Sequence, residues 1–181
     1  TIYGQTSATI NATAATGING SAANVHTVID HAQVNHDTNF TVSISGTSAA
    51  AADLKAIDAI TSGIITATGV ETITGSLSDV GDVVDVDTDT SSAGQQIDID
   101  TNFNVTLSDT GNMSASALNT LNGKVPGTVT VTAAVTLTGT ASDIATAASA
   151  DNAGTLALAS NFGATVSAGA VSATDLTDIV A

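Results

Sequence analysis

The chain of 181 residues lacks cysteine and tryptophan, and it contains one proline and only two basic side chains, Lys55 and Lys124. The absence of cysteine excludes a disulfide framework and thiolate metal sites. Seventeen acidic residues against two basic ones give a formal net charge of −15 at pH 7. Such a charge repels phosphate backbones and anionic lipid headgroups, so we do not expect the protein to bind nucleic acid.

Long apolar runs and aromatic side chains are also scarce. No stretch of about 18 uninterrupted apolar residues occurs, so the sequence predicts no membrane span. The chain opens TIYGQTSATI without a basic leader, which indicates a mature form, a fragment, or a protein that needs no signal peptide. Hydrophobic residues make up 43% and aromatic residues 2%. Because Ala, Val and Ile dominate, we expect a thin core of small side chains.

A periodic pattern divides the sequence into similar segments. Each segment ends its strand-like part on an apolar anchor, and the successive anchors are 26, 29, 34, 30 and 29 residues apart: Ile18, Ile44, Ile73, Leu107, Leu137 and Val166. The pattern predicts a single domain, 1–181, made of repeats at approximately 1–20, 21–47, 48–75, 76–113, 114–139 and 140–171, with 172–181 beginning another.

Each segment changes its hydrophobic period at the anchor. Upstream of it, apolar and polar residues alternate, as in Ile97 to Leu107, which predicts a half-buried strand. Downstream of it, apolar residues follow helical spacing, as in Leu54, Ile57 and Ile60, which predicts a short helix. Five of the six helices have a Ser or Thr in the N-cap position, at Ser21, Ser76, Ser114, Thr140 and Ser172.

The three phenylalanines each follow an asparagine. Four residues before the anchors, large Phe alternates with small Ala or Gly, and the Phe positions are Phe40, Phe103 and Phe162. We expect these rings to be structural core residues, each beside a small residue of the neighbouring segment. The preceding residues are Asn39, Asn102 and Asn161, and we expect them at a bend, because the short amide tolerates left-handed backbone.

Together these patterns predict a mainly-β fold, a β-solenoid of about six coils of roughly 30 residues with short helices or helical turns. One geometric conflict stays open at this point, because stacked strands lie about 4.8 Å apart and packed helices about 8 to 10 Å apart. The helices would have to fan outward, tilt or shorten to turns, or each unit would supply two strands per layer as a hairpin.

Motifs for catalysis are missing, and we do not expect an enzyme. The sequence has no GxGxxG, P-loop, HExxH or GxSxG pattern. His26, His31 and His36 recur every five residues, a spacing that places neighbours on different helix faces. We interpret them as surface histidines rather than as a metal or catalytic set.

One acidic stretch, DVGDVVDVDTDTSSAGQQIDID, is a candidate cation site. Asp85, Asp87 and Asp89 resemble the first three ligands of a calcium loop. The resemblance then fails, because an EF-hand needs Gly where Thr90 stands and Glu where Gln96 stands. The alternatives are a calcium site, the one cofactor considered, and a solvated strand edge whose carboxylates face water.

Two passages, SAAAADLKAIDAITSGIITATGVETITGS and TVSISGTSAAAADL, look like repeats of large secreted surface and adhesin proteins of bacteria, cyanobacteria especially. The resemblance implies an extracellular structural or adhesive role without catalytic residues. Relatives of this kind often carry calcium-binding nonapeptides of the GGxGxD type, and this sequence has none.

The chain begins in strand-type sequence and ends inside a helical segment, DLTDIVA, without a visible polar cap. We therefore expect an extracellular or cell-surface building block that stacks head to tail on itself into a filament, sheath or surface layer. The scarcity of Lys and Arg, which removes targets of trypsin-like proteases, suits that location. One alternative is a stalk segment of a giant adhesin or phage fibre. Another is an ice- or glycan-binding threonine array, formed by Thr128, Thr130, Thr132, Thr136 and Thr138.

Overall fold

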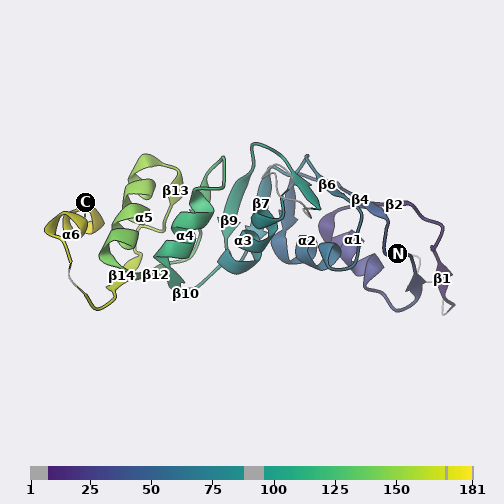
Figure 1. Cartoon of the computed structure of the whole chain (residues 1–181), viewed down its shortest axis with the longest axis horizontal. Coiled ribbons are helices and arrows are strands. Elements are labelled where there is room, and N and C mark those ends of the chain that lie inside the picture. Colours follow the sequence, from purple (N-terminus) through teal and green to yellow (C-terminus); the bar gives the residue numbers. More distant parts are fainter. Residues whose placement is uncertain (1–7, 88–95, 170, 181) are drawn as a thin grey trace.

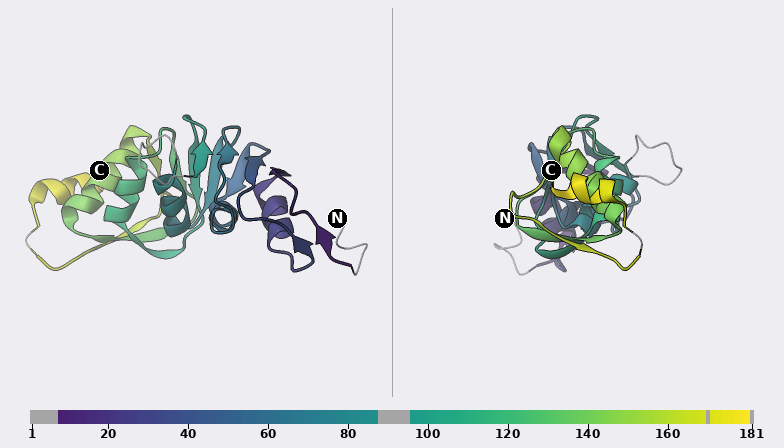
Figure 2. Two further views of the ribbon diagram at one scale, coloured as in Figure 1. Left: turned by 45° about the vertical axis from the view of Figure 1, so that its right-hand side comes forward. Right: turned by 90° about the vertical axis from the view of Figure 1, so that its left-hand side faces the viewer.

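The computed structural model describes residues 8–87, 96–169 and 171–180. The molecule is elongated, with the N-terminus at one end and the C-terminus at the other (Figure 1). The left-hand view of Figure 2 shows the last helix at one end and the first strand at the other, and the right-hand view looks along the long axis from the C-terminal end. Within the described ranges, no helix is both long and apolar enough to cross a membrane.

Six helices lie in chain order along the long axis of the described structure (Figure 1). They are α1 (Ala22–Ile29), α2 (Ala51–Asp58), α3 (Leu77–Asp85), α4 (Ala115–Asn122), α5 (Ala141–Ala153) and α6 (Ala173–Val180). The predicted N-caps are confirmed, because each hydroxyl accepts the backbone N–H three residues on, at Ser21, Ser76, Ser114, Thr140 and Ser172. The exception is α2, which has no side-chain cap because Ala50 stands at its N-cap position.

The strands form parallel sheets. Their bounds are β1 (Ile10–Asn11), β2 (Gly17–Gly20), β3 (Val34–Asn35), β4 (Thr41–Ile44), β5 (Ser48–Ala50), β6 (Ile65–Ala67), β7 (Thr72–Gly75), β8 (Ile97–Ile99), β9 (Asn104–Leu107), β10 (Gly111–Ser114), β11 (Val129–Val131), β12 (Val135–Gly139), β13 (Leu156–Ala157) and β14 (Gly163–Val166). The sheet orders are β1-β3, β2-β4-β6-β8, β5-β7-β9-β11-β13 and β10-β12-β14. Paired residues are separated by 23 positions, as for Val42 and Ile65, up to 32, as for Ile65 and Ile97.

The prediction of a mainly-β solenoid repeat protein is therefore wrong. The structure is an α/β fold with 33% helix, 29% strand and parallel sheets packed with six helices. The segments after the strands do not shorten to turns. Hydroxyl caps satisfy the first-turn amides and Ala-rich sequence favours helix, so these segments form helices of eight to thirteen residues.

The predicted alignment of the anchors is also wrong. Two connections between helices, α1 to α2 and α3 to α4, contain three strands, whereas the other three connections in the described chain contain two. The extra strands are β5 and β10. Gly46 (φ 98°) lies two residues before β5, and Gly111 (φ 80°) is the first residue of β10. As a result Ile73 pairs with Ala49 rather than with Ile44, and Leu137 pairs with Met113 rather than with Leu107.

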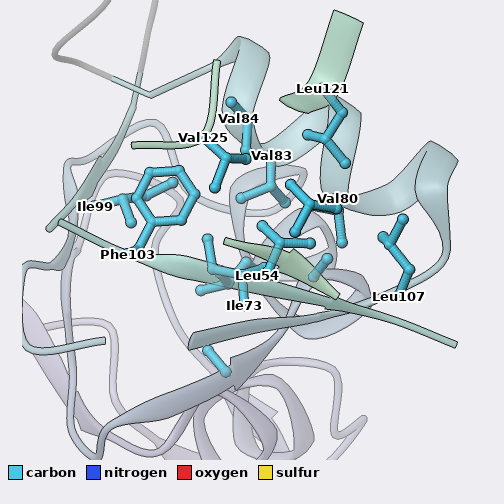
Figure 3. Packing of buried hydrophobic residues seen from close by; sticks show 14 of the residues in the cluster. Leu54, Ile73, Val80, Val83, Val84, Ile99, Phe103, Leu107, Leu121 and Val125 are labelled. Carbon is cyan, nitrogen blue, oxygen red and sulfur yellow. The ribbon is translucent and has the colours of Figure 1, made fainter. Parts of the chain in front are cut away.

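The core fills the space between the sheets and the helices. Figure 3 shows Val80, Val83 and Val84 of α3 pointing into the same apolar cluster as Ile73 of β7 and Leu107 of β9. All five side chains are at most 2% exposed. Val, Ile, Leu and Ala supply most of the buried positions, as the composition suggests.

The three phenylalanines do not have equivalent surroundings. Phe40 and Phe103 are 1% and 3% exposed, whereas Phe162 is only partly buried against the core. Gly63 lies against the Phe40 backbone, because a Cβ on Gly63 would collide with the Phe40 carbonyl oxygen. Thr61 holds this close approach, since its hydroxyl donates to the Phe40 carbonyl and accepts the Gly63 N–H.

This close approach predicts the effect of one methyl group. We expect Gly63→Ala to lower the free energy of unfolding by about 1 to 3 kcal/mol, because the added Cβ meets backbone atoms that must shift. Gly69→Ala is the matched control, since a Cβ at Gly69 would meet nothing within 4 Å, and its effect should stay within about 1 kcal/mol. Urea denaturation of both variants checks this, and equal stabilities would contradict it.

Candidate functional site

The predicted calcium ligands do not come together. Asp85, at the end of α3, forms an ion pair with Lys124 just beyond α4. Asp87 is 5% exposed, and its Oδ1 accepts the Ile99 N–H at 3.1 Å. Asp89 lies outside the described residues. No group of three His, Asp or Glu side chains in the described part of the chain could hold a metal ion, so calcium binding stays a prediction.

The three histidines contact different groups. His26 Nδ1 lies 2.7 Å from Asp53 Oδ1 on the next helix. His31 Nδ1 accepts a backbone N–H two residues on. The two ring nitrogens of His36 face backbone carbonyl oxygens, and its ring packs edge-on against Phe40 with 5.2 Å between centroids. Each histidine therefore has a local structural partner.

The asparagines predicted at bends are all exposed. Asn39, Asn102 and Asn161 precede β4, β9 and β14 by two residues each. The Asn102 N–H donates to Asp100 Oδ1 at 3.1 Å, which turns the chain locally. Their role in bending the chain stays a prediction.

Three of the five threonines of the predicted array contact the neighbouring backbone through their hydroxyls. The hydroxyls of Thr128, Thr132 and Thr138 donate to carbonyl oxygens of adjacent segments. A hydroxyl that donates to the protein is not free to donate to ice or glycan, so no observation favours the array as a binding face.

Polar contacts join neighbouring helices along the row. Lys55 of α2 contacts two carboxylates of α3, with Nζ 2.6 Å from Asp79 Oδ1 and 2.8 Å from Asp82 Oδ2. Lys124 contacts Asp85 across the next junction. Both lysines of the chain therefore link adjacent helices, a role that local sequence patterns do not reveal, because it depends on which helices become neighbours.

The C-terminal end of the molecule exposes apolar side chains that internal helices bury. Leu176 and Val180 of α6 are 49% and 82% exposed, and Val171 just before the helix is 41% exposed. The corresponding positions of α5 are Ile144 and Ala148, which are 0% and 6% exposed. We call Val171, Leu176 and Val180 the C-terminal apolar patch. Its exposure follows from position, since α6 has a neighbouring helix on one side only (Figure 1).

Strand edges that no other described strand pairs with accompany this patch. The outermost strands are β13 and β14 at the C-terminal end and β1 and β2 at the N-terminal end. None of these four strands contains Lys, Arg or Pro, the residues with which natural edge strands commonly resist pairing. Each end presents two strands followed by a helix, in the orders β1-β2-α1 and β13-β14-α6.

Comparisons of the chain with protein-family models, curated proteins and solved structures found no match. The relationship to secreted bacterial surface proteins therefore stays a prediction from the sequence.

The contacts of Asp79 predict a pH dependence of stability. Lys55, and then the Ser76 hydroxyl, hold the pKa of the Asp79 carboxyl below its usual range. A lowered folded-state pKa contributes stability at neutral pH that is lost as the pH falls through that pKa. We expect Asp79→Asn to be less stable than the wild type at pH 7 and equally stable in acid. Thermal unfolding across pH measures this, and a difference that persists in acid would contradict it.

Replacing Asp58 by Asn should change the stability at pH 7 in the opposite direction to Asp79→Asn, although each substitution removes one carboxylate. Asp58 is the last residue of α2, and burial raises the pKa of its carboxyl. Its Oδ1 is buried and has no hydrogen-bond partner among the residues that the structure describes. A raised pKa contributes stability at low pH that is lost as the pH rises through the folded-state value. Asp58→Asn should therefore raise the free energy of unfolding at pH 7 by less than about 1 kcal/mol, since the carboxyl is only partly buried. In acid the variant should gain nothing, and a loss of stability at pH 7 would contradict this assignment.

Proposed function

We propose that the protein is a structural building block of an extracellular filament, sheath or surface layer, whose copies associate end to end. The observation that carries the proposal is the C-terminal apolar patch, where α6 leaves exposed the positions that α5 buries. Covering Val180 and Leu176 with a second copy would remove apolar area from water, which favours association by about 25 cal/mol per Å².

The strand edges give this association a direction. In the proposed contact, β1 and β2 of one copy continue the sheets that end at β13 and β14 of the other, and α1 packs against α6. Because the two contacting surfaces differ, the interface is heterologous and can repeat without closing, which produces a filament rather than a dimer. Extracellular placement rests on the resemblance to secreted surface proteins and on the scarcity of Lys and Arg.

The elongated shape supports a second candidate, a stalk segment that separates other parts of an adhesin or fibre. Its two ends lie far apart along the long axis (Figure 1). A stalk needs no association between separate copies, so this function and end-to-end assembly differ in what the isolated chain does in solution.

Assembly of the purified chain tests the proposal. We expect electron microscopy and analytical ultracentrifugation to show rods whose length grows with concentration. Val180→Asp should raise the concentration needed for assembly at least about tenfold, because the loss of more than about 1.4 kcal/mol of apolar burial weakens each contact tenfold. Circular dichroism verifies that the variant folds.

Ile64→Asp is the matched control. Ile64 is 45% exposed, similar to Leu176, but lies in the connection before β6, away from both ends. Assembly should persist in this variant. Compact monomers of the wild type at all concentrations would overturn end-to-end assembly and leave the stalk, and equal loss in both variants would overturn the assigned contact. Repeating the assay with a chelator tests whether calcium contributes.

A further inference from the structure

The row of helices ends in two different helix faces. Among the described residues, α1 has one neighbouring helix, α2, and α6 has one neighbouring helix, α5 (Figure 1). The C-terminal apolar patch lies at the α6 end. At the other end, the face of α1 that points away from α2 has no helix of the described chain against it. The internal helix pairs indicate which residues of these two faces would meet if a second copy continued the row.

Internal helix pairs meet in one register at three of their five junctions, where the fifth residue of one helix contacts the third residue of the next. At the other two junctions, the fifth residue is Gly81 or Ala145, which has no polar side chain. The third residue of a helix therefore marks the side toward the preceding helix, and the fifth marks the side toward the following one. The contacts are His26 Nδ1 to Asp53 Oδ1 at 2.7 Å, Lys55 Nζ to Asp79 Oδ1 at 2.6 Å, and Asn119 Nδ2 to the Asp143 carbonyl oxygen at 2.8 Å.

The free face of α1 carries Asn24 and Val28. Asn24 is the third residue of the helix and is exposed. Val28, the seventh residue, lies one turn further along the same face and is only half-buried. In α2 to α5 the seventh residue is an apolar side chain that is at most 3% exposed, at Ile57, Val83, Leu121 and Ala147. Val28 is therefore an apolar position that a preceding helix would cover.

The free face of α6 carries Thr177 and Val180. Thr177 is the fifth residue of the helix and is exposed, and its hydroxyl donates to the Ala173 carbonyl within the helix at 2.9 Å. Val180 lies three residues on along the same face and is 82% exposed. In the internal register, Thr177 would lie against Asn24 of a second copy, and Val180 against Val28.

Charge favours the N-terminal end of a second copy as the partner of α6. Asp175 and Asp178 lie in α6, which has no Lys, Arg or His, so two C-terminal ends would bring four carboxylates together. The first 36 residues contain only one of the 17 acidic residues, Asp30. The third residue of α1 is the neutral Asn24, whereas four other helices have a carboxylate at this position, at Asp53, Asp79, Asp143 and Asp175.

We propose that copies of the protein join in the register of the internal helix pairs, with Thr177 against Asn24 and Val180 against Val28. This inference rests on the proposed end-to-end assembly and adds the residues that select the N-terminal end as the partner. Asn24 is a specificity-determining residue in this contact. An aspartate in its place would add a carboxylate opposite an end that already carries two.

A pair of charge substitutions tests the register. In the double variant Asn24→Asp/Thr177→Lys, every interface would place a lysine opposite an aspartate, as Lys55 lies opposite Asp79. We expect Asn24→Asp alone to raise the concentration needed for assembly severalfold. Adding Thr177→Lys should lower that concentration at least about threefold more than it does in the wild-type background, the size expected for an exposed ion pair. Sedimentation in about 50 mM salt, which screens charges weakly, measures both effects.

Asn102→Asp is the charge-matched control. Asn102 is exposed before β9, between the two ends of the molecule (Figure 1), so Thr177→Lys should have no additional effect in this background. Equal rescue of both aspartate variants, or no rescue of Asn24→Asp, would overturn the register and leave end-to-end assembly standing. A wild type that stays monomeric would overturn both. Circular dichroism of each variant verifies folding.

Discussion

Parallel pairing between segments more than twenty residues apart is the constraint on which the rest of the structure depends. One line of paired residues crosses the five-stranded sheet, from Ala49 through Ile73, Val105 and Val129 to Leu156, and none is more than 4% exposed. Each strand is too short to bury its side chains alone, so the neighbouring strand supplies both the hydrogen bonds and the cover. The same dependence leaves the last segment incompletely covered.

The helices impose a second constraint on this pairing. Strands in a sheet lie about 4.8 Å apart, whereas packed helices need about 8 to 10 Å. One continuous sheet with one strand per helix would therefore be shorter than the row of helices beside it. No sheet of the described structure extends from α1 to α6. Instead, β5 and β10 begin new sheets, and the helices that follow them pack beside the new strands.

The row of helices also determines where many of the charged side chains lie. Acidic residues near the helix N-termini, such as Asp53, Asp79 and Asp143, lie where the helix dipole and the capped amides favour a carboxylate. The two lysines each join a pair of helices, and both contact carboxylates of α3: Lys55 contacts Asp79 and Asp82, and Lys124 contacts Asp85. α3 is therefore the helix at which both lysines of the chain compensate acidic charge.

The sequence by itself determined the helices and their caps, because the spacing of Leu54 and Ile57 and the hydroxyl of Ser76 act within one or two turns of chain. It also determined the alternating faces of strands such as β8 and β11. Only the tertiary structure decided the fold class and the register, since alternation fits equally well when a strand slips by two residues, and Ile73 pairs with Val105 rather than with the anchor Leu107. The burial of Asp87 and the exposure of Val180 depend on which distant segments become neighbours, and local patterns carry no information about that choice.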